Sequence, residues 1–124
     1  MKEKARKWLR RAEEDLLALS QLAPIQTPDV VGMLCQQAVE KLLKACWIEL
    51  GWRIPLTHDL RTLWSDLQMH FDFKIESQRL GDLTPYGTRA RYPDFEIDPP
   101  DALEAVEFTL ETCAKLKLWL ESRE

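Results

Sequence analysis

The sequence is poor in the residues that build metal centres, disulfide frameworks and phosphate-binding loops. Its 124 residues include three cysteines, two histidines and four glycines. An odd number of cysteines, spread through helical patterns, argues against a disulfide framework. With two histidines and no Cys-x-x-Cys motif, the sequence predicts no metal site and no other cofactor. It also contains no glycine-rich loop of the kind that cradles phosphates in nucleotide-binding folds.

Long apolar runs and alternating apolar patterns are absent as well. No apolar run approaches the ~20 residues that a membrane-spanning helix requires. The charged start MKEKARKWLRR leads into an amphipathic pattern and not into the apolar core of a signal peptide. We therefore expect a cytoplasmic protein with no membrane partner. With 45% hydrophobic and 31% charged residues, a chain of this length predicts a single domain spanning residues 1–124.

The chain carries a small excess of negative charge that is unevenly distributed. A net charge of −4 disfavours a protein that coats nucleic acid through bulk electrostatics. Residues 1–11 hold six Lys or Arg against one Glu, whereas residues 96–124 hold eight Asp or Glu against three Lys or Arg. Either antiparallel packing sets these two ends against each other, or one of them meets a partner.

The stretch from Val30 to Gly51 predicts one long helix around which the rest of the chain is organised. Its apolar residues recur with the i, i+3, i+4, i+7 spacing of an amphipathic helix, and Cys35 and Cys46 are small members of that apolar arc. The strongly polar residues of the middle section fall in one stripe: Gln36, Gln37, Glu40, Lys41 and Lys44. Such a stripe is either the solvated back of the helix or the wall of a site, and patterning favours the solvated back.

Helical periodicity and helix-end signals predict the other elements. Pro28 and Pro99 occupy first helical positions behind Thr27 and Asp98 as N-caps, and Thr57 is expected to cap a helix with His58 in its first turn. The expected helices besides the central one are Lys2–Leu22, residues 57–69, Ile75–Leu83 and residues 99–122. The predicted fold is an all-α, antiparallel up-and-down bundle of four to five helices.

Four short motifs in this order resemble the HEPN family, the "higher eukaryotes and prokaryotes nucleotide-binding" domains. They are AEEDL at 12–16, QQAVEKLLKA at 36–45, THDL at 57–60 and ARYPD at 90–94. The resemblance implies a helical bundle, frequently a homodimer, that is often encoded beside a small nucleotidyltransferase. Many HEPN proteins resemble metal-independent ribonucleases, with an Arg followed after four to six residues by a His near the start of the last helix.

This sequence departs from that ribonuclease pattern. No histidine follows His70, so neither Arg89 nor Arg91 has the expected partner. The spacing does occur between Arg53 and His58, but this pair lies in a connector that contains Pro55, far from the last helix. We assign no catalytic residue, and Arg53 and His58 stay secondary candidates because His58 is better explained as a residue that fixes a helix start.

The arginine-rich segment before the last helix is the predicted ligand-binding site. Arginine holds a phosphate with two bonds, and a tyrosine ring stacks on a base or covers the arginine plane. The alternative, left open, is that Arg91 pairs internally with Glu40 while Tyr92 packs under the last helix. The predicted ligand-binding residues are Arg89, Arg91, Tyr92, Tyr86, Glu40 and Lys44.

Three functions are compatible with these residues. The favoured one is a non-catalytic domain that binds nucleotide or RNA phosphate and works with a small nucleotidyltransferase, as in toxin and antitoxin pairs. The alternatives are a metal-independent ribonuclease with an unusual residue set and a helical protein-interaction module. Metal-free RNA cleavage needs an acid and a base poised near neutral pH, which weakens the ribonuclease alternative. We also predict a homodimer whose shared surface includes tryptophans: Trp47, Trp52, Trp64 and Trp119.

Overall fold

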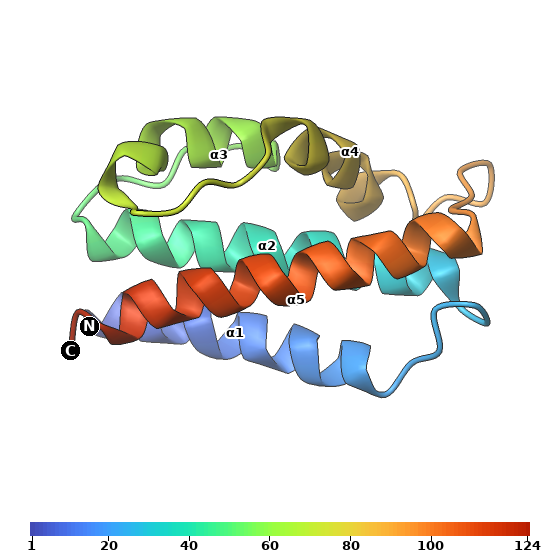
Figure 1. The fold of residues 1–124 in the computed structure, drawn as a ribbon, viewed down its shortest axis with the longest axis horizontal. Helices are drawn as coiled ribbons and strands as arrows, with labels where there is room; N and C mark the ends of the chain where they lie inside the picture. Colours follow the sequence, from blue (N-terminus) through green and yellow to red (C-terminus); the bar gives the residue numbers. More distant parts are fainter.

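The computed structural model describes residues 1–124 and contains helices but no strand (Figure 1). The prediction of an all-α bundle is confirmed. None of the helices has both the length and the apolar content needed to cross a membrane. The helices are α1 (Glu3–Ser20), α2 (Pro28–Glu49), α3 (Leu60–Leu67), α4 (Ser77–Thr88) and α5 (Pro99–Glu121), with a 3-10 turn at Gln68–His70.

Helix α2 is the centre of the structure. Fifteen of its 22 residues are buried, which explains why its sequence is apolar over such a wide arc. It packs against the other four α-helices, and a cluster of 25 buried residues joins all five. Figure 1 shows α1 and α2 running in opposite directions and α5 running in the same direction as α2. The short helices α3 and α4 together occupy the place of one long helix between α2 and α5 in the chain.

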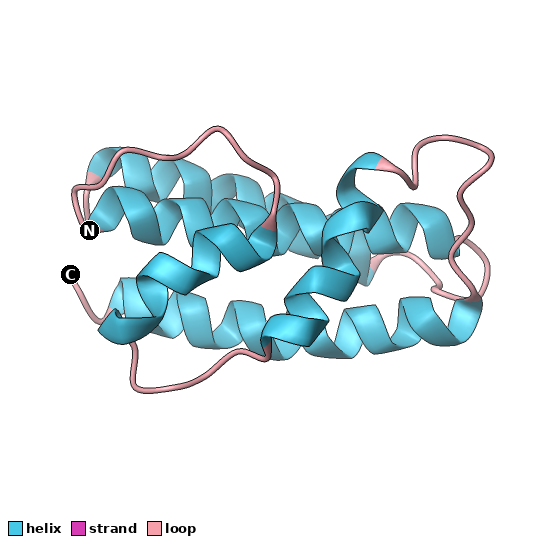
Figure 2. Cartoon of the chain, turned by 90° about the horizontal axis from the view of Figure 1, so that it is seen from above, coloured by secondary structure: helices cyan, strands magenta, loops and turns pink.

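Helices α3 and α4 lie across α2 on the side away from α1 (Figures 1 and 2). The expected start of α3 is two residues too early, because Asp59 and not Thr57 is its N-cap. The Asp59 carboxylate accepts the backbone N–H of Arg61 at 2.9 Å, so His58 precedes the helix instead of lying in its first turn. The expected end of the fourth helix is also wrong, since α4 continues through Pro85 to Thr88.

The two chain ends lie side by side, which is one of the two arrangements that the charge distribution allowed (Figure 1). Arg6 near the start of the chain pairs with Glu124 at 2.5 Å. Farther along the same two helices, Lys117 of α5 pairs with Glu13 of α1 at 3.1 Å. Both pairs are partly exposed and screened by solvent, so they align the two ends of the chain more than they hold the fold together.

The tryptophans are used differently from the prediction. Trp47 and Trp64 are 9% and 3% exposed, so they belong to the core and their assignment to a shared surface is wrong. Trp52 packs edge-on against Trp47, and Trp119 lies 4.6 Å from Phe71 between ring centroids. Aromatic contacts at the end of the bundle therefore cover most of this apolar surface within one chain.

Candidate functional site

The polar stripe of α2 is a buried wall and not the solvated back of the helix. Gln36, Glu40 and Lys44 are 0%, 5% and 8% exposed. Their i, i+4 spacing places them on one side of α2, and the connector before α3 passes over that side. The prediction that this stripe faces solvent is wrong because patterning within one helix cannot show that a later segment covers its polar side.

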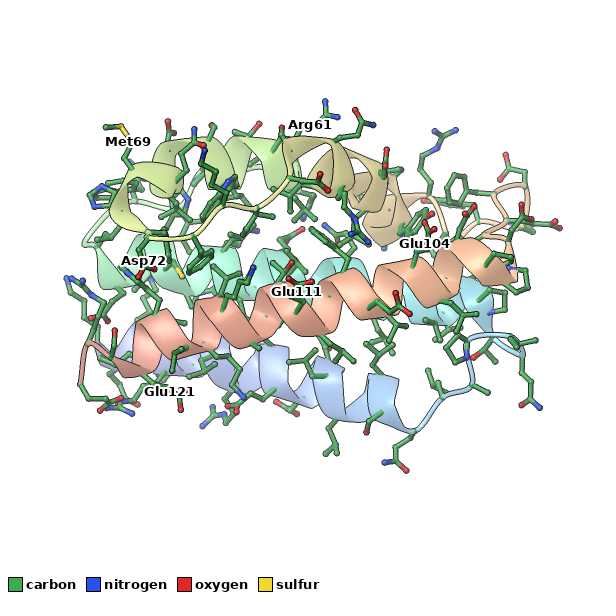
Figure 3. All side chains as sticks on the ribbon, viewed as in Figure 1. Arg61, Met69, Asp72, Glu104, Glu111 and Glu121 are labelled. Carbon is green, nitrogen blue, oxygen red and sulfur yellow. The ribbon has the colours of Figure 1, made fainter.

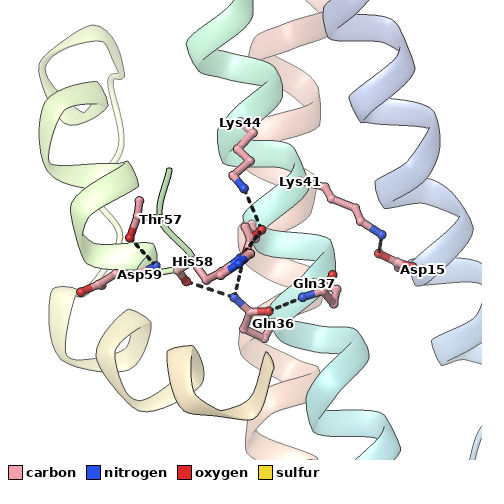
Figure 4. Close-up of polar contacts among 9 residues, drawn as sticks. Asp15, Gln36, Gln37, Lys41, Lys44, Thr57, His58 and Asp59 are labelled. Carbon is pink, nitrogen blue, oxygen red and sulfur yellow. Dashed lines mark hydrogen bonds and ion pairs between the residues drawn. The ribbon is translucent and has the colours of Figure 1, made fainter. Parts of the chain in front are cut away.

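The Glu40 carboxylate is the hub of a hydrogen-bonded network, and Figure 4 labels its partners Gln36, Lys44 and His58. Its Oε1 accepts from Gln36 Nε2 at 2.9 Å, and its Oε2 accepts from Lys44 Nζ at 2.9 Å. His58 Nδ1 lies 3.0 Å from Oε1 and 3.1 Å from Oε2. Gln37 donates to Gln36 Oε1 at 2.8 Å, so the network extends to the partly exposed side of α2. A fully satisfied buried network of this kind fixes the orientation of each member.

The ionised form of Glu40 is the stable one in this setting. Burial alone raises the pKa of a carboxylate, but hydrogen bonds from Gln36, Lys44 and His58 and the charge of Lys44 outweigh it. The pKa of Glu40 is therefore below its ordinary value of 4.5. An ionised carboxylate accepts the Nδ1–H of His58, so the ring is held at that edge while its Nε2 has no partner within the chain.

The backbone around His58 is fixed by its neighbours in the THDL motif. Thr57 Oγ1 accepts the N–H of Asp59 at 3.1 Å, and Asp59 caps α3. Gln36 Nε2 also reaches the carbonyl oxygen of His58 at 3.2 Å. Leu60, fully buried, anchors the start of α3 in the core. The His58 side chain is 64% exposed, so a ring held at Nδ1 presents its other edge to solvent.

A cavity of about 360 Å³ opens beside the His58 ring. Its lining contains two cationic or proton-binding side chains, Arg91 and His58, and no carboxylate. The Arg91 guanidinium is exposed and makes one long internal contact, from Nε to the carbonyl oxygen of Thr88 at 3.4 Å. A free arginine fork without a competing carboxylate in the lining favours an anion. The lining residues are Met33, Leu34, Gln37, His58, Gly87, Thr88 and Arg91.

Gly87 allows α4 to approach α2 closely enough to form this cavity. A Cβ atom at position 87 would collide with the side chain of Gln36, including its amide oxygen. The glycine is buried, so neither helix has room to shift outward at this point. Gly87 is therefore the residue that lets Gln36 point toward Glu40 and the His58 carbonyl oxygen.

The structure separates the predicted ligand-binding residues. Arg91 lines the cavity, whereas Glu40 and Lys44 lie beneath it in the buried network. The Arg89 guanidinium lies over the Phe95 ring, 5.2 Å from its centroid, and Tyr92 is 59% exposed. The alternative in which Arg91 pairs with Glu40 and Tyr92 packs under the last helix is wrong. Arg53, the secondary catalytic candidate, is exposed and does not line the cavity with His58.

Tyr86 lines a different and acidic cavity. This cavity, of about 440 Å³, lies between α4 and α5 and is lined by Asp82, Asp101 and Glu104 among others. Burial and then the charges of Asp101, Asp82 and Glu104 raise the pKa of Tyr86. Three carboxylates against the single cation Arg79 disfavour phosphate, so this cavity and the one beside His58 differ in electrostatic character.

The cysteines do not contribute a nucleophile. Cys35, Cys46 and Cys113 are free and buried, as expected for small core residues. Burial raises the pKa of Cys35 to about 11 and that of Cys113 to about 12, and it raises the pKa of Cys46 as well. Thiols with raised pKa values stay protonated near neutral pH and are inert. No group of three or more metal-binding side chains is present either.

Comparison with known protein families decides the assignment of the fold. The family model for the HEPN domain matches residues 5–119, which include almost all of α1 and α5 and everything between them. The chain belongs to the HEPN domain family. No match was found among curated proteins or among solved structures. In this HEPN domain, the THDL and ARYPD motifs meet at one cavity, to which they contribute His58 and Arg91 respectively.

Five residues of the cavity were not predicted from the sequence, and a sixth, His58, was undervalued. Met33, Leu34, Gln37, Gly87 and Thr88 carry no chemical signature that distinguishes them from ordinary helix residues. The consecutive glutamines at 36 and 37, within an otherwise apolar helix, are the one signal that points to a polar wall. His58 was placed in a helix turn because the capping preference of Thr57 hid the role of Asp59.

Proposed function

We propose that this HEPN domain binds the phosphate of a nucleotide or an RNA in the cavity between His58 and Arg91. The observation that supports the proposal most directly is the charge of that cavity. Arg91 supplies a planar fork of donors with no acidic partner, and His58 is held in place by Glu40. A phosphate bound there gains charged hydrogen bonds from Arg91 without displacing an internal ion pair, and it lies beside the exposed edge of the His58 ring.

We favour phosphate binding over phosphodiester cleavage because the cavity holds few side chains that can transfer a proton. His58 is the one lining residue whose side chain is suited to act as an acid or a base, since Gln37 and Thr88 do not ionise. Transfer of a proton both to and from a phosphodiester normally uses two such groups. The cavity therefore suits recognition of a phosphate better than hydrolysis of one.

Arg91→Ala tests the binding proposal. We expect this change to weaken binding of a fluorescently labelled adenosine nucleotide or short RNA by about 1–3 kcal/mol, the scale of charged hydrogen bonds. The melting temperature should stay nearly the same, because Arg91 is exposed and has no internal ion pair. Arg89→Ala is the matched control, since Arg89 lies over Phe95 outside the cavity. Equal binding by native and Arg91→Ala proteins would contradict the proposal.

We further propose that the domain works in the cytoplasm with a small nucleotidyltransferase, in a toxin–antitoxin-like pair. Membership of the HEPN family supports this role, and the structure supports it through a cavity suited to a nucleotide phosphate. The test is to identify a short nucleotidyltransferase gene beside this one and to co-purify the two products. Absence of such a neighbour would favour the third function, a helical interaction module.

Ribonuclease activity is the second candidate, and the pairing of Glu40 with His58 is the observation in its favour. A buried carboxylate that orients an imidazole is the arrangement by which hydrolases prepare a general base. We nevertheless expect little or no cleavage of single-stranded RNA in the presence of a chelator. Cleavage that is lost in His58→Ala and kept in Arg53→Ala would make the ribonuclease the leading function.

A further inference from the structure

Gln37 lines the cavity beside Arg91, and its amide oxygen has no hydrogen-bond partner within the chain. The side chain is partly exposed and makes one hydrogen bond, which its Nε2 donates to Gln36 Oε1 at 2.8 Å. An amide oxygen only accepts, so it can bind a ligand group that carries an O–H or an N–H. A phosphate brings acceptor oxygens of its own and leaves the Gln37 oxygen without a donor.

The network beneath the cavity fixes which end of the Gln37 amide is free. Gln36 Nε2 lies 2.9 Å from Glu40 Oε1 and 3.2 Å from the carbonyl oxygen of His58. A carboxylate and a carbonyl both accept, so the NH₂ group of Gln36 must face them. The oxygen of Gln36 then faces Gln37, which has to donate to it, and Figure 4 draws this bond between the two glutamines.

Packing against α4 prevents the Gln36 amide from turning over. Gln36 is fully buried and lies against Gly87, where a Cβ atom would already collide with the amide oxygen. Reversal would also set this oxygen against the Glu40 carboxylate and lose both hydrogen bonds of the NH₂ group. The polarity of an amide does not change with pH, in contrast to that of an imidazole, so Gln37 offers the cavity a permanent acceptor.

The size of the cavity limits what can lie next to a bound phosphate. Its volume of about 360 Å³ is near the lower end of the roughly 300–1,000 Å³ that small-molecule pockets enclose. A phosphate at Arg91 therefore leaves space mainly for the group bonded to it, which in a nucleotide is the sugar. Ribose carries a 2′-OH that can donate a hydrogen bond and that deoxyribose lacks. The amino group of a base is a donor as well, but it lies farther from the phosphate.

We propose that Gln37 Oε1 accepts a hydrogen bond from the 2′-OH of a ribose whose 3′-phosphate is bound by Arg91, so that the cavity selects ribonucleotides over deoxyribonucleotides. This inference rests on the proposed function, because it places a sugar beside the phosphate in the same cavity. Arg91 supplies the affinity for phosphate, and Gln37 supplies the choice of sugar.

An NMR titration of the native protein with three nucleotides tests this choice. The probes are adenosine 3′-monophosphate, its 2′-deoxy analogue and its 2′-fluoro-2′-deoxy analogue, which keeps an electronegative substituent but has no O–H. We expect the ribonucleotide to bind about 3- to 10-fold more tightly than either analogue, the range that one neutral hydrogen bond gives. Equal binding of the ribonucleotide and either analogue would overturn this inference alone. Failure of all three to bind would overturn the phosphate site and this inference with it.

Gln37→Met tests the residue, because methionine has a similar length and no strong acceptor. We expect the preference for the ribonucleotide over its 2′-deoxy analogue to disappear. The ratio of the two affinities is the readout, since a general change in the cavity affects both ligands. Gln78→Met is the matched control and should keep the native ratio. Gln78 also donates its Nε2 to a neighbour, Asp82 at 2.9 Å, but beside the acidic cavity, where Figure 3 labels Glu104. A native ratio in Gln37→Met would overturn the role of Gln37.

Discussion

Glu40→Ala should destabilise the protein by about 3 kcal/mol, the scale seen when one member of a buried ion pair is removed. The change leaves the Lys44 ammonium, 8% exposed, without its carboxylate and removes the acceptor for Gln36. It also releases the His58 ring from the orientation that faces the cavity. Thermal and denaturant unfolding of the variant measure the effect on stability.

Two companion variants identify the cause of that loss. Lys44→Met added to Glu40→Ala removes the stranded charge and should recover a large part of the stability. Asp15→Ala breaks the more exposed pair with Lys41, 2.6 Å apart, and should cost less than about 1 kcal/mol. If Glu40→Ala proved no more harmful than Asp15→Ala, the buried network would not be the stabilising unit described above.

The contribution of Glu40 also has a definite pH dependence. Because its pKa is lowered by folding, the stability from its ionised form is complete above its ordinary pKa of 4.5. That stability is lost as the pH falls through the depressed folded-state pKa. The stability difference between the native protein and Glu40→Gln should therefore be constant from pH 7 to about 5 and should shrink in more acidic solution. A difference that grows on acidification would contradict this assignment.

Gly87→Ala should destabilise the protein by about 1–3 kcal/mol, the usual cost of adding a methyl group to a packed interior. In an exposed helix the same change would instead stabilise by up to about 1 kcal/mol, because alanine is the better helix former. At position 87 the added Cβ meets the Gln36 side chain, so Gln36 must leave Glu40 and the His58 carbonyl. The variant should lose nucleotide binding together with stability.

Gly81→Ala in the same helix is the matched control. Its Cβ would meet the guanidinium of Arg61, the far end of a flexible and exposed side chain that is able to move away. We expect a stability within about 0.5 kcal/mol of the native protein and unchanged binding. Equal behaviour of the two alanine variants would show that Gly87 is not required for the shape of the site.

The helical architecture was predictable because each long helix has its own periodicity and end signals. Pro28 and Pro99 mark the starts of α2 and α5 as expected, and the apolar arc of α2 identifies the helix around which the others pack. The end of α4 was not predictable in the same way. Helix α4 continues through Pro85 and packs against α2 and α3. A proline in the sequence predicts a helix end from local geometry alone and carries no information about such packing.

The candidate site was only half predictable, because it is assembled from three separated segments. Arg91 could be predicted as a ligand-binding residue from its chemistry alone, because the guanidinium of an arginine is suited to hold a phosphate. The value of His58 depends on Glu40, eighteen residues earlier in the chain. His58 and Glu40 come together only because the connector passes over α2, and the sequence of the connector does not predict that path.

An NMR titration of the native protein with adenosine monophosphate tests whether the cavity beside His58 binds phosphate. We expect changes in the chemical shifts of amide, imidazole and arginine side-chain signals to concentrate at His58, Arg91, Gln37 and Thr88, which line one cavity. We also expect signals of the acidic cavity beside Tyr86 to stay unchanged. Shifts centred on that acidic cavity, or no shift at His58 and Arg91 at millimolar nucleotide, would contradict the assignment of the phosphate site.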